Sequence, residues 1–251
     1  MTPALAVYAG LLLARLGAFA AVMPLFGARS PRLVRVGFVL ALAAFYLSTV
    51  PPQMAAQPAG RGMEVESLRY GLALVRESLI GAAMGFAFGL FLMPARIAGE
   101  FVTTQIGLNV SPQAGPTGEG AAGPLTTVFE TVAGLVFLVA DAHHIVLAAL
   151  HASFATYPLG GTGVPEAGPM ITGLSTAYEM GLLLAAPLGA CLFLLAITMA
   201  VMARAAPQLN VYSIGFTLQV LVVLFGGLFL LPDLVLTMNA ITARVGAMIP
   251  M

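Results

Sequence analysis

Two long uncharged segments near the C-terminus restrict the fold of this chain more than any other feature. Residues 181–203 and 211–231 contain no Asp, Glu, Lys or Arg. Each is long enough to cross the hydrocarbon core of a bilayer as a helix, which takes about 20 apolar residues. The connection between them carries Arg204, Pro207, Gln208 and Asn210, so we predict a tight polar turn and a helical hairpin.

The composition of the whole chain supports the same class of protein. Hydrophobic residues make up 60% of the sequence and charged residues only 8%, against about 25% in a soluble globular domain. The charged residues are too few to form a surface that faces water on all sides. Most of the surface is therefore expected to meet lipid or other protein. The formal net charge is +0, which provides no basic face for nucleic acid, and we predict no nucleic-acid partner.

Four further apolar segments bring the total to about six. They cover residues 4–26, 36–50, 68–93 and 125–154, and they are shorter or more polar than the last two. We therefore predict an all-α, integral-membrane-type bundle of about six apolar helices arranged as helical hairpins. We expect one domain over residues 1–251, and the six segments need not be six spans.

Two features of the apolar segments indicate helix faces that touch protein. Arg15 lies near the middle of the first segment, where a guanidinium costs at least about 2.5 kcal/mol, so it should face a partner group, a cluster of carbonyls or water. Gly81, Gly85 and Gly89 recur every four residues and let another backbone approach closely. Both predict helix–helix contacts.

A polar stripe is predicted on the segment 125–154. In one continuous helix, Glu130, Asp141, His144 and His151 fall within an arc of roughly 80°. His143 would then point away from the other three, and no HExxH motif is present, so we predict no metal site. The expected role is a polar face satisfied by partner helices or water.

No catalytic residue and no cofactor is predicted. Ser153 lies at a helix end, where hydroxyls commonly satisfy backbone groups, and Ser175 adjoins a capping-box pattern at residues 176–179 that is expected to open a helix. The sequence contains no nucleophile elbow, phosphate loop or dinucleotide-binding fingerprint.

The least regular stretch is residues 107–124, which hold five glycines and three prolines. It cannot be a helix. Two alternatives remain open: an exposed linker, or non-helical backbone inserted into a cavity at membrane depth. The adjoining Thr103, Thr104 and Gln105 favour a wet lining.

Short motifs from nearly the whole chain occur together in one known family. They are Arg15, Met23-Pro24, Pro31 and Arg35; Glu77, Gly81 and Gly85; Ala98-Gly99-Glu100, Gln105 and Gly107; His143-His144; Ser153-Phe154 and Pro158; Ala186-Pro187; and Arg204-Ala-Ala-Pro207-Gln208-Leu-Asn210. On these residues the chain resembles the FliR/SctT family, the export-gate component of the flagellar and related type III secretion apparatus.

The resemblance implies a non-enzymatic subunit of the flagellar export gate in the bacterial inner (cell) membrane, within the flagellar basal body. It would assemble with FliP and FliQ, and with FlhA and FlhB, into a conduit for unfolded flagellar subunits. The stretch after Ala98-Gly99-Glu100 would be a plug across the closed conduit. Its residues would include Gly107, Leu108, Asn109, Val110, Ser111, Pro112, Gln113, Gly115, Pro116, Gly118, Gly120 and Gly123.

The resemblance also implies a set of residues for helix packing and assembly. These are Arg15, Pro24, Glu77, Gly81, Gly85, Gly89, Gly99, Arg204, Pro207, Gln208 and Asn210.

A small-molecule membrane transporter is the alternative function. It would need paired repeats, broken helices and charged residues converging near the middle of the membrane. The polar stripe is the one candidate for such a site, and the sequence has no internal repeat to support it.

Overall fold

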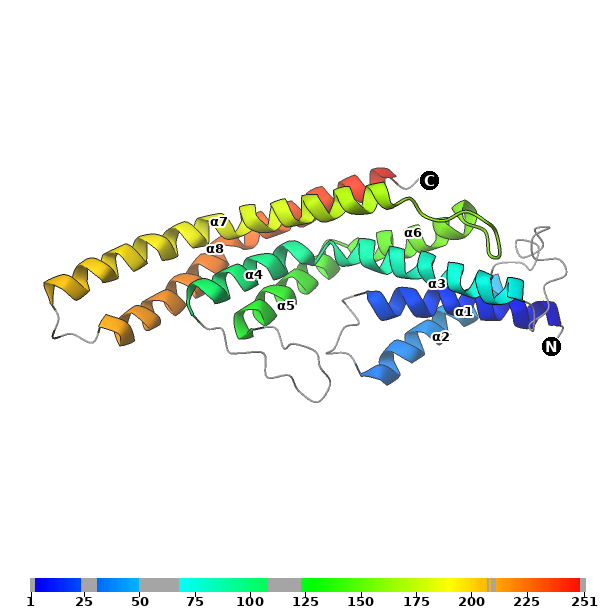
Figure 1. Cartoon of the computed structure of the whole chain (residues 1–251), viewed down its shortest axis with the longest axis horizontal. Helices are drawn as coiled ribbons and strands as arrows, with labels where there is room; N and C mark the ends of the chain where they lie inside the picture. Colours follow the sequence, from blue (N-terminus) through cyan, green and yellow to red (C-terminus); the bar gives the residue numbers. More distant parts are fainter. Residues whose placement is uncertain are drawn as a thin grey trace. The chain divides into compact units, whose positions relative to one another are not determined.

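The computed structural model describes residues 3–23, 31–49, 68–107, 123–206, 208 and 211–248, and these residues contain helices and no strand. Figure 1 shows the helices with their labels. They are α1 (Pro3–Val22), α2 (Arg32–Thr49), α3 (Leu68–Gly89), α4 (Met93–Gln105), α5 (Pro124–Val139), α6 (Ala142–Thr156), α7 (Ala167–Ala205) and α8 (Val211–Met248). The all-α prediction is confirmed.

Proline marks several of the helix starts. Pro94 lies in the first turn of α4, and Pro124 opens α5. The fixed φ of proline suits a first turn, and its missing N–H is not needed there. Pro187 and Pro232 lie inside α7 and α8, which are 39 and 38 residues long.

Three predicted boundaries are wrong. The segment 68–93 does not form one helix, because α3 ends at Gly89 and a separate helix, α4, begins at Met93. The segment 125–154 is interrupted at Ala140–Asp141, where Asp141 has a φ of 53° that an α-helix cannot contain. Residues 176–179 do not open a helix, because α7 already begins at Ala167 and holds Pro169 in its first turn.

Four of the described helices are long and apolar enough to cross a membrane: α1, α3, α7 and α8. A fifth span results if α5 and α6, a bent pair, are counted together. The described part of the chain therefore has fewer candidate spans than the six apolar segments.

The chain divides into two compact units. The first contains residues 1–90, 143–173 and 245–251, and so includes α1, α2, α3 and α6. In it, α1 and α3 lie side by side and run in the same direction, as Figure 1 shows. Their interface buries Leu16 and Ile80, and the rings of Phe19 and Phe88 meet edge to face with centroids 6.2 Å apart.

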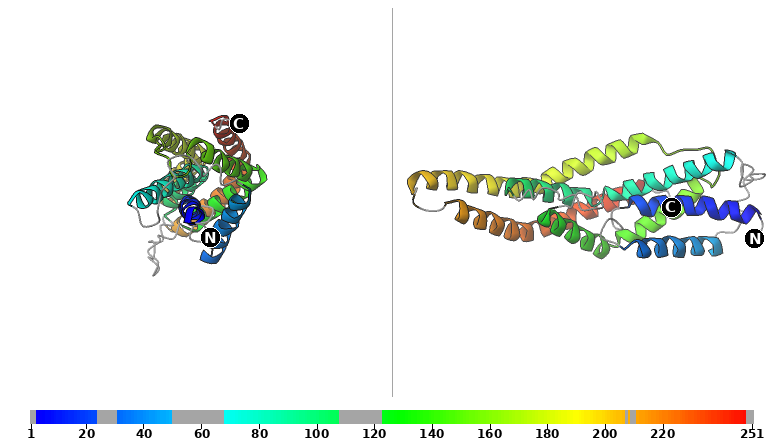
Figure 2. Two further views of the ribbon diagram at one scale, coloured as in Figure 1. Left: turned by 90° about the vertical axis from the view of Figure 1, so that its right-hand side faces the viewer. Right: turned by 60° about the horizontal axis from the view of Figure 1, so that its bottom comes forward.

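The second unit contains residues 91–142 and 174–244, and so includes α4, α5 and most of α7 and α8. Figure 2 shows α7 and α8 as neighbours, and a Cβ added at Gly215 of α8 would lie 3.0 Å from the Met199 methyl carbon of α7, which confirms the predicted hairpin. Side chains from all four helices form one core: Val102, Ile106, Leu125, Leu188, Leu192, Val223 and Leu230. That the whole chain is one domain stays a prediction.

The outer faces of α7 and α8 are apolar. Leu183, Phe193 and Val201 on α7, and Leu224 and Phe229 on α8, are all exposed. Apolar surface on this scale fits contact with lipid or with other protein.

Candidate functional site

A buried ion pair lies at the centre of the first unit. Nε of Arg15 on α1 donates a 2.7 Å hydrogen bond to Oε2 of Glu77 on α3, and neither side chain has exposed surface. In this structure Arg15 therefore lies against a polar partner on a neighbouring helix. Each charge compensates the other, whereas either one buried alone would carry a large desolvation cost.

Arg15 also binds the C-terminal end of α6. Its guanidinium donates to the Ser153 carbonyl oxygen at 3.2 Å and to the Tyr157 carbonyl oxygen at 2.6 Å, and it lies 4.8 Å from the centroid of the Phe154 ring. The last carbonyls of a helix lack intrahelical partners and carry partial negative charge, so a cation is favourable here. The Ser153 hydroxyl donates to the Leu150 carbonyl oxygen at 2.7 Å, as expected for a structural serine.

Arg76 extends this cluster to the chain that follows α6. It donates to Oε1 of Glu77 at 2.7 Å, to the Pro158 carbonyl oxygen at 3.2 Å and to the Gly163 carbonyl oxygen at 2.7 Å. The Gly160 N–H also donates to Oε1 of Glu77. The pair Arg15 and Glu77, with Arg76, therefore holds α1, α3, the end of α6 and residues 157–163 together.

The role of Arg76 was not foreseen from the sequence. A signal was available, because Arg76 directly precedes Glu77 in an apolar helix, and a second charge there also needs a partner.

The predicted glycine face of α3 packs directly on the backbone of α1. A Cβ added at Gly81 would overlap the Arg15 carbonyl oxygen, and one at Gly85 would lie 2.6 Å from the Phe19 carbonyl oxygen. The backbones of α1 and α3 therefore lie close together at these two positions. Gly89 is half-buried and is the last residue of α3.

In the second unit, residues 107–123 connect α4 to α5, and these two helices are tightly packed against each other. α4 and α5 touch so closely that a Cβ at Gly99 would lie 2.7 Å from Cα of Thr126. The hydroxyls of Thr103 and Thr126 are buried and 3.3 Å apart, and Thr103 donates to the Gly99 carbonyl oxygen at 2.6 Å. We call Gly99, Thr103, Gly123 and Thr126 the hairpin base.

One end of the stretch, Gly123, belongs to this hairpin base, and the other end, Gly107, follows α4. Gly107 has a φ of 73°, a backbone conformation that glycine adopts without strain, and it turns the chain out of α4. At the other end, a Cβ on Gly123 would lie 2.9 Å from the Thr103 methyl carbon. Residues 108–122, and with them most of the predicted plug, lie outside the described residues.

The three polar residues expected to line a wet space differ in exposure. Thr104 and Gln105 are exposed, whereas Thr103 is buried at the hairpin base. Only two of the three therefore keep the predicted environment.

A mixed-charge group lies near the hairpin base. Arg96 on α4 donates to Oε1 of Glu100 at 2.9 Å, and its Nε lies 3.6 Å from a carboxylate oxygen of Glu130 on α5. The hydrogen bond with Glu100 raises the pKa of Arg96 above its ordinary value, so the guanidinium stays charged.

The predicted polar stripe is not a single helix face, because the break at Asp141 separates α5 from α6. Glu130 pairs with Arg96, and His151 stacks on Tyr46 of α2 with ring centroids 6.0 Å apart. These two members of the stripe therefore serve different local contacts.

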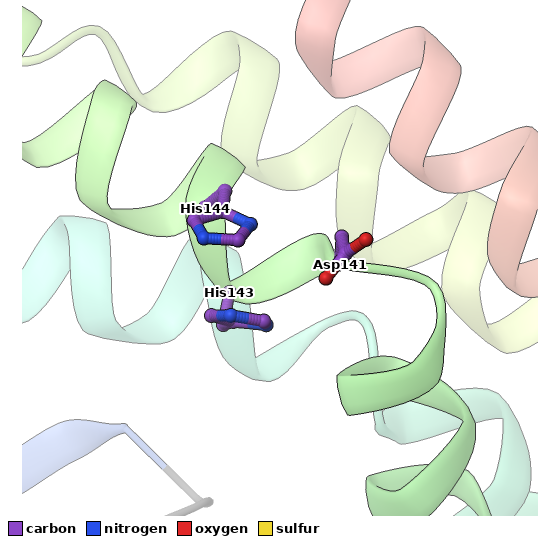
Figure 3. A group of neighbouring side chains, drawn as sticks. All are labelled: Asp141, His143 and His144. Carbon is purple, nitrogen blue, oxygen red and sulfur yellow. The ribbon is translucent and has the colours of Figure 1, made fainter.

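The break also changes the position of His143. The prediction that it points away from Asp141 and His144 is wrong, because ligand atoms of the three residues lie within 4.8 Å of one another. Figure 3 shows the three side chains at the turn between α5 and α6.

At the end of the α7–α8 hairpin, Arg204 and Gln208 are exposed. Pro207 and Asn210 lie outside the described residues, as does Pro24.

These features define an all-α integral membrane protein whose polar side chains mainly join helices to one another. A model for the family described as "Bacterial export proteins, family 1" matches residues 6–245. The chain belongs to this family, and the resemblance to the FliR/SctT family is confirmed.

Individual relatives agree with the family assignment. The flagellar biosynthetic protein FliR of Bacillus subtilis (strain 168) is 29% identical over 218 residues, which are 83% of this chain and 80% of the relative. FliR of Caulobacter vibrioides is 27% identical over 85% of this chain and 84% of the relative. The surface presentation of antigens protein SpaR of Shigella sonnei is 23% identical over 61% of this chain and 59% of the relative.

Proposed function

We propose that this chain is a non-enzymatic subunit of the flagellar type III protein export gate in the bacterial inner membrane. The observation that carries the proposal is the family match over residues 6–245 together with the FliR relatives. The subunit would assemble with FliP and FliQ, and with FlhA and FlhB, into a conduit for unfolded flagellar subunits. The exposed apolar faces of α7 and α8 give it surface for such partners and for lipid.

The hairpin base supports a sealing role for residues 107–123. A plug must yield to a passing chain and then return to the same place. A composition rich in glycine suits the first requirement, because glycine accepts many backbone conformations, and attachment to a well-packed base suits the second. Gly99, Thr103 and Thr126 provide that fixed base through direct packing and hydrogen bonds.

The test is an ion-leak measurement on membranes that contain the assembled gate. Deletion of residues 108–122 keeps Gly107 and all four residues of the hairpin base. It should leave co-purification with FliP and FliQ intact and make the membranes leaky to small ions. Gly134→Ala, where the added methyl meets open space, serves as the control whose membranes should not leak ions. An unchanged leak in the deletion variant would refute the plug.

A second experiment concerns assembly. Arg15→Leu leaves Glu77 buried without its strongest partner, and it frees the end of α6. We expect markedly less FliP and FliQ to co-purify with this variant than with wild type. The control Arg96→Leu removes an exposed arginine and should co-purify normally. Normal co-purification of Arg15→Leu with FliP and FliQ would show that the buried cluster is not needed for assembly.

The transporter alternative has lost its best support. Its one candidate site was the polar stripe, and two members of that stripe make separate local contacts, Glu130 with Arg96 and His151 with Tyr46. Uptake of a small solute by the isolated protein in liposomes would revive it.

A further inference from the structure

Helix α4 differs from its neighbour α7 in the kind of side chain that it exposes. Every exposed residue of α4 is polar: Arg96, Glu100, Thr104 and Gln105. The apolar residues of α4 are all buried or half-buried, whereas α7 exposes large apolar side chains such as Leu183 and Phe193. The first three polar residues are spaced by four and therefore share one helix face. We call Arg96, Glu100 and Thr104 the α4 polar row.

The α4 polar row is ordered by contacts within the second unit. Nε of Arg96 donates to Oε1 of Glu100 at 2.9 Å and lies 3.6 Å from a carboxylate oxygen of Glu130 on α5. The Thr104 hydroxyl donates to the Glu100 carbonyl oxygen at 2.8 Å. The side chains of Arg96 and Glu100 are still 55% and 54% exposed. The row therefore presents charges of both signs on an open face.

Packing against α7 sets the level of α4 along that longer helix (Figure 1). A Cβ added at Gly181 would lie 2.8 Å from Cβ of Ile97, and one added at Gly189 would lie 2.8 Å from Cε1 of Phe101. Phe101 directly follows Glu100 in the chain. Glu100 therefore lies within a helical turn of the level of Gly189.

That level lies deep in the membrane. The uncharged part of α7, residues 180–203, is the part that suits the hydrocarbon core, and Gly189 is near its middle. A charged side chain is costly at this depth unless it faces protein or a water-filled cavity. Because α4 exposes only polar residues there, lipid is excluded as the neighbour of the α4 polar row.

We propose that the α4 polar row lines a water-filled space at membrane depth, and that an exported polypeptide passes along it in extended form. This inference rests on the proposed function and names the surface that meets the substrate. An extended chain carries backbone donors and acceptors along its whole length. The row offers donors on Arg96 and acceptors on Glu100 and Thr104, and α4 exposes no apolar side chain that would retain an apolar segment. The row ends where residues 107–123 begin, so it leads to the proposed plug.

The first experiment measures thiol modification in membranes that contain the assembled gate. A Cys191→Ala background is needed, because Cys191 is exposed. Thr104→Cys is compared with Phe193→Cys, which lies one helical turn beyond Gly189 and is exposed on the apolar face of α7. A charged, membrane-impermeant thiosulfonate is supplied to both faces of the membrane. Thr104→Cys should react about tenfold faster or more, because a thiol ionises to its reactive form in water and not in lipid.

The same pair of variants is tested without residues 108–122, because a plug at rest would cover part of the row. Fast reaction of Thr104→Cys in either background supports the water-filled space. Reaction of Thr104→Cys as slow as that of Phe193→Cys in both backgrounds would overturn it.

The second experiment tests the exported chain. A flagellar subunit fused to a tightly folded domain that cannot pass will hold an extended segment in the gate. Thr104→Cys should then lose most of its fast reaction, while Phe193→Cys is unchanged. Full reactivity of Thr104→Cys in the occupied gate would overturn passage along the row. The proposed function fails separately, if FliP and FliQ do not co-purify with wild type, and fast reaction of Thr104→Cys would still establish the water-filled space.

Discussion

Arg15 on α1 and Glu77 on α3 are joined by a 2.7 Å hydrogen bond, and both side chains are completely buried. Glu77 also accepts a hydrogen bond from Arg76, and Arg15 reaches the carbonyls at the end of α6. The hydrogen bonds of this pair therefore link α1, α3 and the end of α6.

Glu77→Ala should strongly destabilise the first unit. It leaves Arg15 buried without a compensating charge, which typically costs about 3–5 kcal/mol. The measurement is thermal unfolding in detergent followed by circular dichroism. Arg15→Met combined with Glu77→Leu should recover much of the loss, because an apolar pair of similar volume removes both charges. If the double variant is no more stable than Glu77→Ala, the loss of stability does not come from leaving Arg15 without a compensating charge.

Gly81→Ala should destabilise the packing of α3 on α1. The added methyl would overlap the Arg15 carbonyl oxygen, and backbone cannot move aside cheaply, so we expect a loss of about 1–3 kcal/mol. Gly71→Ala, on an exposed part of the same helix with open space around it, should instead stabilise by up to about 1 kcal/mol. Denaturation of the two variants under the same conditions gives the comparison, and equal effects would contradict close backbone contact.

Gly99→Ala should loosen the hairpin base without changing the Gly/Pro-rich stretch itself. The new Cβ would lie 2.7 Å from Cα of Thr126 and 3.2 Å from Cβ of Phe129, so α4 and α5 must separate. We expect a loss of about 1–3 kcal/mol and a raised ion leak in assembled gates. A variant that is destabilised but seals normally would show that the base does not position the plug.

Arg96→Ala should have a small effect by comparison. Arg96 and Glu100 are each more than half exposed, and exposed ion pairs contribute about 0–1 kcal/mol. We expect the free energy of unfolding to change by less than about 1 kcal/mol, and the difference to shrink as salt is raised. A loss of stability as large as that of Glu77→Ala would mean that solvent exposure does not weaken the Arg96–Glu100 ion pair relative to the buried Arg15–Glu77 pair.

Much of the fold could be predicted from residue type and spacing. Uncharged segments of about 20 residues indicate membrane helices wherever they occur, and the α7–α8 hairpin follows from two of them and a polar turn. Arg15 and the glycines at 81 and 85 were expected at helix contacts, because a buried charge needs a partner and a glycine ladder needs a close neighbour, and in the structure they lie at the contact of α1 with α3. These arguments require no knowledge of which helix the neighbour is.

Other features depend on contacts between distant parts of the chain. That Glu77 is the partner of Arg15, 62 residues away, is not contained in the local sequence of either helix. The same holds for Arg76 and the carbonyls of residues 158 and 163, and for Thr103 with Thr126. A local pattern shows that a group needs a partner, and packing selects the partner.

The helix break at Asp141 separates the two kinds of information most clearly. The sequence by itself determined that residues 125–154 are apolar and helical, because composition and periodicity are local properties. Only the tertiary structure decided that one helix ends at Val139 and another begins at Ala142, since a single residue with positive φ leaves no mark on hydrophobic periodicity. That one backbone angle divides the predicted stripe and brings His143 to Asp141, so side chains predicted to lie apart become neighbours.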